Sequence, residues 1–270
     1  SYIDTFIRVN PNYPKITKKL DIIRSIPQPD QRTNEWYEFR YNHITASSAW
    51  KAFLSENKQN ELIYEKCCPL NLDKYKGCSI DSPLHWGQKY EPISVQWYDM
   101  MNCCKVEEFG CIPHQEVKCL AASPDGIVTD KDSDIYGRML EIKNVVSRVI
   151  NGVPKLEYWI QMQLQMEVCN LNECDFLETK FVEYEDEAEF NNDGSFIQTQ
   201  DNKLKGAMMC FMKNDKPFYE YPPISISKED FETWENKVME RNKEYTWVKN
   251  IFWKLEEISC VLVLRNKSVS

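Results

Sequence analysis

The residues of this chain that could do chemistry concentrate between Ser123 and Lys143, in the sequence SPDGIVTDKDSDIYGRMLEIK. Asp125 stands beside a glycine near the start of this stretch, and an acid–apolar–Lys triplet from Glu141 to Lys143 closes it. Side chains alternate between the two faces of a strand. Glu141 and Lys143 are therefore predicted to point one way, and the apolar residues on either side of Glu141 the other.

A hairpin would bring the two acids of this stretch together. If the polar turn at residues 131–137 folds the chain back, Asp125 lies beside Glu141 at the edge of a sheet. Close carboxylates repel unless a cation lies between them, and hard oxygen ligands favour Mg²⁺ or Mn²⁺ over zinc. Such an ion polarises a phosphoryl oxygen and supplies a hydroxide, while Lys143 orients the water or stabilises developing charge. An ordinary hairpin with a solvated, charged face explains these residues alone equally well.

A second candidate site lies earlier in the chain. Thr33 or Asn34 can cap a helix that ends near Arg40, and Thr45 or Ser47 can cap the next helix. A guanidinium, hydroxyl groups and free backbone N–H groups at a helix N-terminus are the parts of a phosphate site. Taken alone, these residues favour a simpler interpretation, in which the arginine lies on a helix surface and the serine is a plain cap.

Two further helices are predicted from hydrophobic periodicity. In residues 83–101, apolar residues recur at spacings of three or four from Trp86 to Trp97, and Glu91 lies off this stripe, where an acid is ordinarily just solvated. In residues 156–170, Gln161 and Gln165 share a face beside an apolar one. A core helix seldom needs three glutamines in five residues, so we expect this face to meet something other than solvent.

Strands are predicted on both sides of the second of these helices. The strand that carries Glu141 precedes it and residues 174–184 follow it, which predicts a βαβ crossover. Residues 106–128 are strand-like and lead into Asp125. Beyond residue 182 we expect an acidic surface excursion over residues 183–205, a strand at 216–226, a long helix at 228–247 and a strand-sized apolar run at 258–264.

Composition restricts the class of protein. The chain has 270 residues, 42% of them hydrophobic, and a net charge of -9, which excludes a uniformly basic surface but not a local basic site. No apolar run approaches the ~20 residues that span a bilayer, and no secretory signal is visible. The 11 cysteines include no C-x-x-C spacing. We therefore expect an intracellular protein with reduced thiols that is not secreted and binds no membrane.

Five motifs together carry a resemblance to a known family. In chain order they are QR-x-x-x-W-x-x-x-R-x-x-x-ITAS, WG-x-x-YE, SPDG, EIK and Y-x-x-Q-x-Q. Their order and spacing resemble the lambda-exonuclease or YqaJ-type viral recombination nucleases of the PD-(D/E)XK superfamily, from Gln31 to about Val168. The resemblance implies an α/β fold with a mixed central sheet flanked by helices.

The resemblance also implies a role for each matching residue. Asp125 and Glu141 would be metal ligands together with the backbone carbonyl of Ile142, and Lys143 would be the catalytic lysine. Glu91 would support the metal through water or a second ion.

Three other residues match motif positions of the family. Gln161 would be the motif glutamine on the helix behind the sheet. Arg40 and Ser47 would bind the terminal 5′-phosphate of the DNA.

The implied activity is Mg²⁺-dependent hydrolysis of DNA, with Mn²⁺ as a substitute. We expect an exonuclease that acts 5′ to 3′ on duplex ends in viral recombination, repair or defence. An endonuclease or structure-specific nuclease on the same core, or a catalytically idle DNA-binding module, remain the alternatives. The intact Asp–Glu–Lys set argues against the idle module.

A second relative differs in its cysteines. The RecB-like nucleases of CRISPR adaptation share the core and bind an iron–sulfur cluster through four cysteines, three of them close together near the C-terminus. This chain has only Cys210 and Cys260 in its C-terminal third. No iron–sulfur cluster is therefore expected.

Composition and the positions of the family motifs suggest a source and a domain organisation for the protein. Abundant Asn, Lys and Ile favour an AT-rich genome, which suits a RecB-like nuclease of a giant DNA virus acting in the host cytoplasm or viral factory. We expect a single nuclease domain over residues 1–270, with an N-terminal arm at 1–30, the core motifs at 31–182 and a C-terminal strand and helix elaboration at 183–270. A homo-oligomer and a recombination or defence protein as partner stay open.

Overall fold

The structure is a computed structural model that describes residues 12–77 and 79–268. Part of the predicted N-terminal arm, residues 1–11, therefore lies outside the described residues. The helices described are α1 Tyr13–Ser25, α2 Asn34–Tyr41, α3 Ala46–Ala49, η1 Trp50–Phe53, α4 Glu56–Cys67, η2 Leu72–Tyr75, α5 Pro83–Asn102, α6 Leu156–Cys169, α7 Glu187–Asn192 and α8 Lys228–Arg241. The strands described are β1 Ile44–Thr45, β2 Val106–Glu107, β3 Ile112–Pro113, β4 Leu120–Ala122, β5 Gly126–Val128, β6 Met139–Asn144, β7 Glu173–Glu183, β8 Lys205–Lys213, β9 Lys216–Glu220 and β10 Thr246–Leu264.

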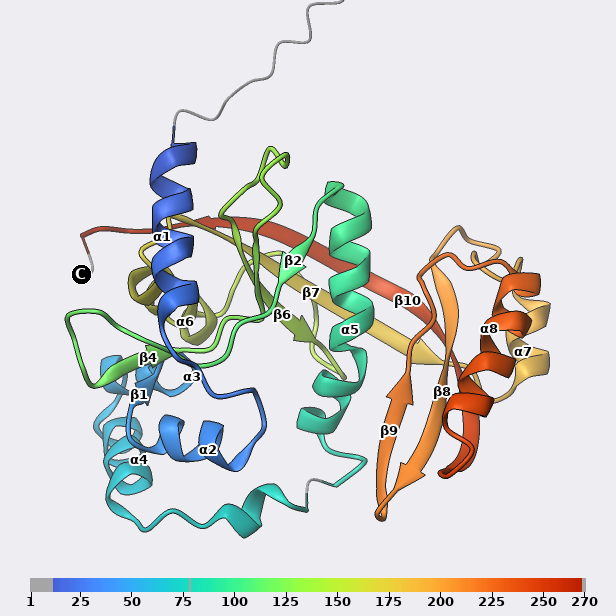
Figure 1. Ribbon diagram of the computed structural model, residues 1–270, viewed down its shortest axis with the longest axis horizontal. Helices are drawn as coiled ribbons and strands as arrows, with labels where there is room; N and C mark the ends of the chain where they lie inside the picture. The colour runs from blue at the N-terminus through green and yellow to red at the C-terminus, as the bar shows by residue number, and fades with distance from the viewer. Residues whose placement is uncertain (1–11, 78, 269–270) are drawn as a thin grey trace, which may run out of the picture.

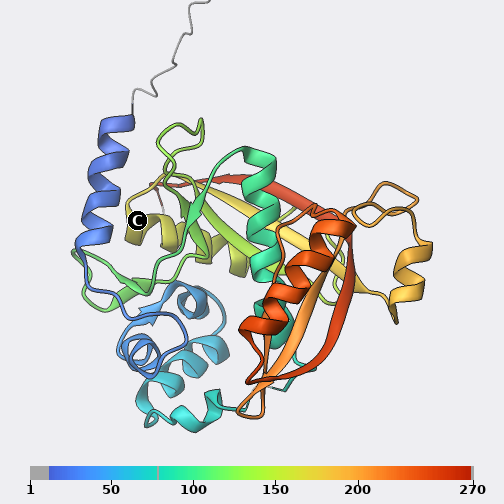
Figure 2. The ribbon, with the colours of Figure 1, turned by 45° about the vertical axis from the view of Figure 1, so that its right-hand side comes forward.

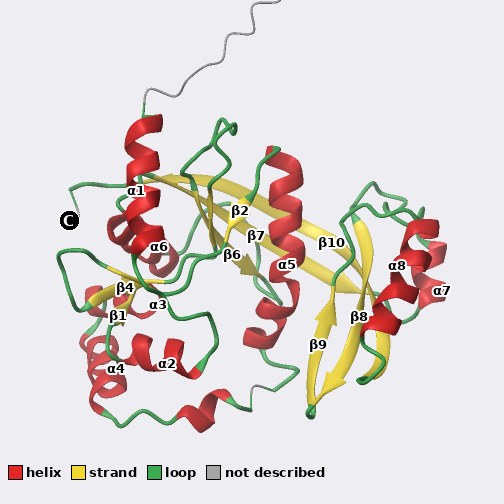
Figure 3. Cartoon of the chain, viewed as in Figure 1, coloured by secondary structure: helices red, strands yellow, loops and turns green. Residues whose placement is uncertain are grey.

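These strands form a large mixed sheet and a small one. The large sheet has the order β2-β5-β6-β7-β10-β8-β9, with β6 and β7 parallel and the other neighbours antiparallel. The small sheet has the order β1-β4-β3 and lies between α6 on one side and α2, α3 and α4 on the other, as Figure 3 shows. Helices flank the large sheet on both faces (Figure 1), so the predicted α/β class with a mixed central sheet is confirmed.

The two faces of β6 pack against different helices. Leu140 and Ile142 share a buried cluster with Tyr98 of α5, whereas Met139 packs with Met162 of α6 on the opposite face. The parallel pairing of β6 with β7 across α6 confirms the βαβ crossover. Because side chains alternate along a strand, the Glu141 and Lys143 positions of β6 face α6.

Strand β10 joins the C-terminal part of the chain to the central sheet. It pairs with β8 over its first half and with β7 over its second half, with a register shift beside Leu255 (Figure 2). Only the run at 258–264 was expected to be a strand, and β8 was not expected. The acidic excursion at 183–205 contains α7, and its Phe190 and Lys205 are buried, so this segment is more than a surface loop.

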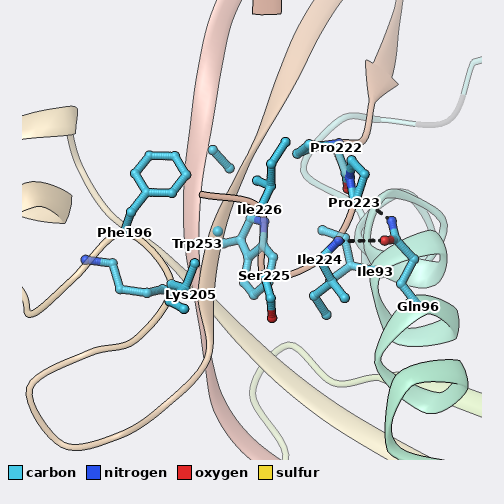
Figure 4. A pocket seen from close by; sticks show the side chains of 13 residues that line it. Ile93, Gln96, Phe196, Lys205, Pro222, Pro223, Ile224, Ser225, Ile226 and Trp253 are labelled. Atoms are coloured by element: carbon cyan, nitrogen blue, oxygen red, sulfur yellow. Dashed lines mark hydrogen bonds between the residues drawn. The ribbon is translucent and has the colours of Figure 1, made fainter. Parts of the chain in front are cut away.

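A loop after β9 attaches this C-terminal part to α5. The Gln96 side chain donates to the Pro222 carbonyl (3.2 Å) and accepts from the Ile224 N–H (2.8 Å), as Figure 4 shows. The loop covers Trp253 of β10 from the side of α5. Within the described part of the chain, none of the helices has both the length and the apolar character needed to cross a bilayer.

A buried hydrogen bond between α5 and β7 should contribute measurably to stability. The Tyr98 hydroxyl donates to Asp175 (2.6 Å), a carboxylate that also pairs with Arg138 (3.4 Å). Hydrogen bonds to charged groups contribute about 1.5–3 kcal/mol. We expect Tyr98→Phe to lower the free energy of unfolding by about that amount in urea titrations, whereas Tyr64→Phe, at a side chain that is 72% exposed, should change it little. Equal effects of the two variants would contradict this account.

Candidate active site

The carboxylate of Glu141 lies at the centre of a buried polar cluster between β6 and α6. The Glu141 side chain is only 2% exposed. Its Oε1 lies 2.8 Å from the Lys143 ammonium and accepts from the Gln161 amide (3.0 Å), and its Oε2 accepts from the Gln165 amide (2.9 Å). Lys143 also donates to the Gln161 carbonyl oxygen (3.3 Å). Both oxygens of this buried anion are therefore held by donors.

Asp125 reaches this cluster through the predicted hairpin. β5 pairs antiparallel with β6, with Gly126 opposite Leu140, so the hairpin is confirmed. The Asp125 Oδ2 accepts from the Ile142 N–H at 2.6 Å, which fixes the carboxylate against β6. A side chain on Gly126 would place its Cβ 2.0 Å from Val106 of β2, so only glycine fits beside Asp125.

Burial and nearby negative charges raise the pKa of two acids of the site, Asp125 and Glu91. Burial, followed by the negative charges of Glu141 and Glu91, raises the pKa of Asp125 well above its usual range, although Lys143 acts in the opposite direction. Burial also raises the pKa of Glu91 on α5, against the opposing effect of Arg32, whose guanidinium lies 3.8 Å from the Glu91 carboxylate. Asp125, Glu91 and Glu141 thus share one negative field.

Lys143 remains charged in this surrounding. Burial acts to lower the pKa of Lys143, but the charges of Glu141 and Asp125 outweigh it and the pKa is raised overall. The ammonium lies 4.8 Å from the centre of the Tyr158 ring. Lys143, Tyr158 and Glu91 line a pocket of about 450 Å³, which gives the cluster a side that a substrate can reach.

Arg40 lies in a second polar group next to this site. Its guanidinium donates to Ser47 (2.9 Å) and to Ser123 (3.3 Å), and it lies 4.4 Å from the centre of the Trp36 ring. Burial lowers the pKa of Arg40. Ser123 precedes Asp125 by two residues, so the Arg40 group is connected to the acids. Arg40 is thus half-buried and hydrogen-bonded beside the acids, and its binding of a phosphate stays a prediction.

The structure thus brings the sequence-predicted residues into two adjoining groups. One contains Asp125, Glu141, Ile142, Lys143 and Gln161, with Glu91 nearby, and the other contains Arg40 and Ser47.

Two residues of the site, Gln165 and Ser123, were not predicted from the sequence. The spacing of four between Gln161 and Gln165 was the available signal for Gln165, since it places both on one helix face. Their shared contact is the Glu141 carboxylate. On the predicted apolar face of α6, Ile160 and Leu164 are only half-buried and Val168 is buried. Gln161, Gln163 and Gln165 are all buried.

The chemistry of these residues fits a hard divalent cation. In the described residues, no three His, Cys, Asp or Glu side chains form a group that could hold a metal ion without other donors. The donors would be the Asp125 and Glu141 carboxylates with the Ile142 carbonyl, an all-oxygen set of the kind that Mg²⁺ and Mn²⁺ prefer. A cation there would relieve the repulsion that raises the pKa of Asp125.

A mixed sheet in which a hairpin brings two acids beside a lysine, followed by a βαβ crossover, has the PD-(D/E)XK architecture. The chain belongs to the YqaJ-like viral recombinase domain family, whose pattern matches residues 35–172, just over half of the sequence. The family resemblance is therefore confirmed.

The individual proteins that resemble this chain have sequence identities of 30% or less. An uncharacterized protein of Acanthamoeba polyphaga mimivirus is 30% identical over 299 residues, which cover 95% of this chain and 52% of that protein. The chain thus spans about half the length of this relative. Two solved structures of an alkaline exonuclease from Laribacter hongkongensis, one of them in complex with dAMP, are each 28% identical. Their TM-scores are 0.43 and 0.42, and they cover 55% and 54% of this chain and 74% and 73% of theirs.

The raised pKa of Asp125 predicts how the metal-free protein responds to pH. A carboxyl group that holds its proton more tightly when folded loses stabilisation as pH rises from its unfolded pKa of about 3.9 through its folded pKa. We expect Asp125→Asn to raise the free energy of unfolding at pH 8 and to flatten its decline between pH 5 and pH 8, measured by urea titration in EDTA.

The matched control for this experiment is Asp132→Asn, at an exposed position of the turn before β6, which should leave the pH profile unchanged. An Asp125→Asn variant that is less stable than the parent at pH 8 would overturn the electrostatic argument.

Proposed function

We propose that this protein is a Mg²⁺-dependent deoxyribonuclease that degrades duplex DNA from its ends in the 5′-to-3′ direction, with Mn²⁺ as a substitute cofactor. The observation that carries the proposal is the buried unit in which Lys143, Gln161 and Gln165 all contact Glu141, beside Asp125. Membership of a viral recombinase family supports a role in the recombination, repair or defence of viral DNA.

Each residue of the unit has a separate task in the proposed reaction. A divalent cation held by Asp125, Glu141 and the Ile142 carbonyl would polarise a phosphoryl oxygen and activate the attacking water. Lys143, kept charged by its acidic neighbours, can orient that water and stabilise charge that develops on the phosphate. Gln161 contacts both Glu141 and Lys143, and so keeps the metal ligand and the lysine in a fixed relation.

Glu91 would support the cation from a different element, helix α5. It lies on α5, a different element from the other acids, and it shares their electrostatic field. Its ion pair with Arg32 leaves the carboxylate near the 450 Å³ pocket that Lys143 also lines. We assign Glu91 to water-mediated contact or to a second ion.

The Arg40 group would bind the 5′-phosphate at the end of the DNA. Two hydroxyl groups and an aromatic ring hold the guanidinium, and none of them neutralises its charge. Lys66 adds a second cation, because its ammonium donates to the Arg40 carbonyl (2.8 Å) and the charge of Arg40 contributes to lowering the pKa of Lys66, after burial. A phosphate there would contact two cations and the Ser47 hydroxyl.

The proposed chemistry predicts distinct defects for the lysine and for the acids. Asp125→Asn and Glu141→Gln should abolish cleavage of end-labelled linear duplex DNA and remove Mg²⁺ binding in calorimetry. Lys143→Met should lower kcat by about 10²- to 10³-fold, the usual cost of removing one stabilising donor, and retain Mg²⁺.

Lys155→Met is the matched control, since Lys155 also approaches the Tyr158 ring (6.0 Å). Cleavage of covalently closed circles at the rate of linear DNA would favour an endonuclease, and DNA binding without cleavage would favour an idle module. Near-normal turnover of Asp125→Asn would contradict the assignment of Asp125 as a ligand of the catalytic cation.

The Arg40 group predicts a preference for phosphorylated ends. Duplexes with a 5′-phosphate should be digested on the order of 10- to 100-fold faster than 5′-hydroxyl duplexes, because one charge-assisted hydrogen bond contributes about 1.5–3 kcal/mol. Arg40→Ala should erase the preference and leave Mg²⁺ binding intact, and added salt should weaken the preference in the parent. Arg241→Ala, at an exposed arginine on α8, should change nothing. Equal rates on both ends in the parent protein would refute end recognition by Arg40.

A further inference from the structure

The second half of β10 has a free edge. On the side of β8, the pairing of β10 ends at Lys254, and the Leu255 N–H donates to the Leu204 carbonyl (2.8 Å). From Glu256 to Leu264, β7 is the only strand that pairs with β10 in the described parts of the chain, and Figures 1 and 2 both show β10 as the border of the sheet there. The backbone groups along such an edge can pair with a further strand.

The side chains on one face of this edge are apolar and exposed. Ile258, Leu262 and Leu264 are 38%, 44% and 61% exposed, and Cys260 between them is exposed as well. They lie on the face that α5 covers elsewhere, because Cys260 is opposite Leu177 of β7, and Leu177 packs in the α5 cluster. Helix α5 covers β6 and β7 but leaves this strip open to solvent.

The other face of the same segment is covered. Val263 belongs to the core cluster that includes α6, and the loop at Gly152 approaches Ser259 and Val261. This segment of β10 is thus fixed by β7 on one side and by packing on one face. Its other face is apolar and exposed, and the backbone groups along its free edge have no strand partner in the described residues. Its sequence, EEISCVLVL, has no proline or lysine of the kind that usually keeps an edge from pairing.

We propose that this edge, residues 256–264 of β10, pairs antiparallel with the same edge of a second copy of the chain. A second copy fits this edge because the segment is complementary to itself. Full overlap places Cys260 on the two-fold axis and Ile258 opposite Leu262 of the second copy. Glu257 is then opposite Val263, so no glutamate faces another glutamate. Such an interface uses the same patch on both copies, as two-fold dimers do.

The position of Cys260 on the two-fold axis allows the dimer to be detected by disulfide formation. Directly opposite residues in antiparallel strands have Cα atoms about 4.5–5.5 Å apart. That separation lies within the range of about 4.4–6.8 Å that a disulfide spans. The two Cys260 thiols should therefore join under mild oxidation, although the reduced protein needs no such bond to pair.

The dimer can be tested on the whole 270-residue chain without DNA or metal. We expect analytical ultracentrifugation to detect a concentration-dependent dimer, and copper phenanthroline to convert it to a disulfide-linked dimer on non-reducing gels. Cys260→Ser should abolish the disulfide-linked species and leave the reversible dimer. Leu262→Lys, which puts a charge on the apolar strip, should raise the dissociation constant at least tenfold.

The controls separate pairing at this edge from general adhesion or misfolding. Met239→Lys changes a side chain of similar exposure, 40%, on α8 and should leave the dimer intact. Unfolding curves should show that Leu262→Lys folds like the parent. A monomer at all concentrations, a dimer that Leu262→Lys leaves unchanged, or oxidation products that persist in Cys260→Ser would each overturn the proposal.

Discussion

The structure of the site depends on keeping one charged carboxylate, that of Glu141, inside the protein. An unpaired buried charge is strongly unfavourable, so the surrounding elements must supply donors. Lys143 comes from the same strand, and Gln161 and Gln165 come from successive turns of α6. The crossover that places α6 behind β6 is thus required by the electrostatics of Glu141 as well as by the packing of Met139 and the other apolar residues of that face.

The site contains more acidic than basic side chains, because Lys143 stands against three acids, Asp125, Glu91 and Glu141. Burial, together with the charges of Glu141 and Glu91, raises the pKa of Asp125, and Lys143 offsets only part of that effect. A protein selected for stability alone would replace such repelling acids, since strained sites of this kind lower stability. Their presence is explained if a divalent cation completes the site, and this is the link between the electrostatics of the fold and the proposed hydrolysis of DNA.

Local features of the site followed from the sequence, and distant contacts did not. The hairpin at Asp125 and the strand at Glu141 are set by alternation and by one polar loop between neighbouring strands, so a single stretch of sequence predicts them. The contact of Arg40 with Ser123 was not predicted, because Ser123 lies 83 residues away in the sequence. The first half of β10 and all of β8 were also missed. Their pairing with each other is non-local, and the first half of β10 has a sequence of mixed polarity.

We propose that Asp125 and Glu141 hold one catalytic cation together. The most direct measurement is the anomalous diffraction of crystals grown with Mn²⁺ and a short 5′-phosphorylated duplex. We expect an anomalous peak in contact with both carboxylates and with the Ile142 carbonyl, and loss of that peak in crystals of Glu141→Gln. A peak bound by other residues, or no peak at saturating Mn²⁺ with Lys143 still paired to Glu141, would contradict it.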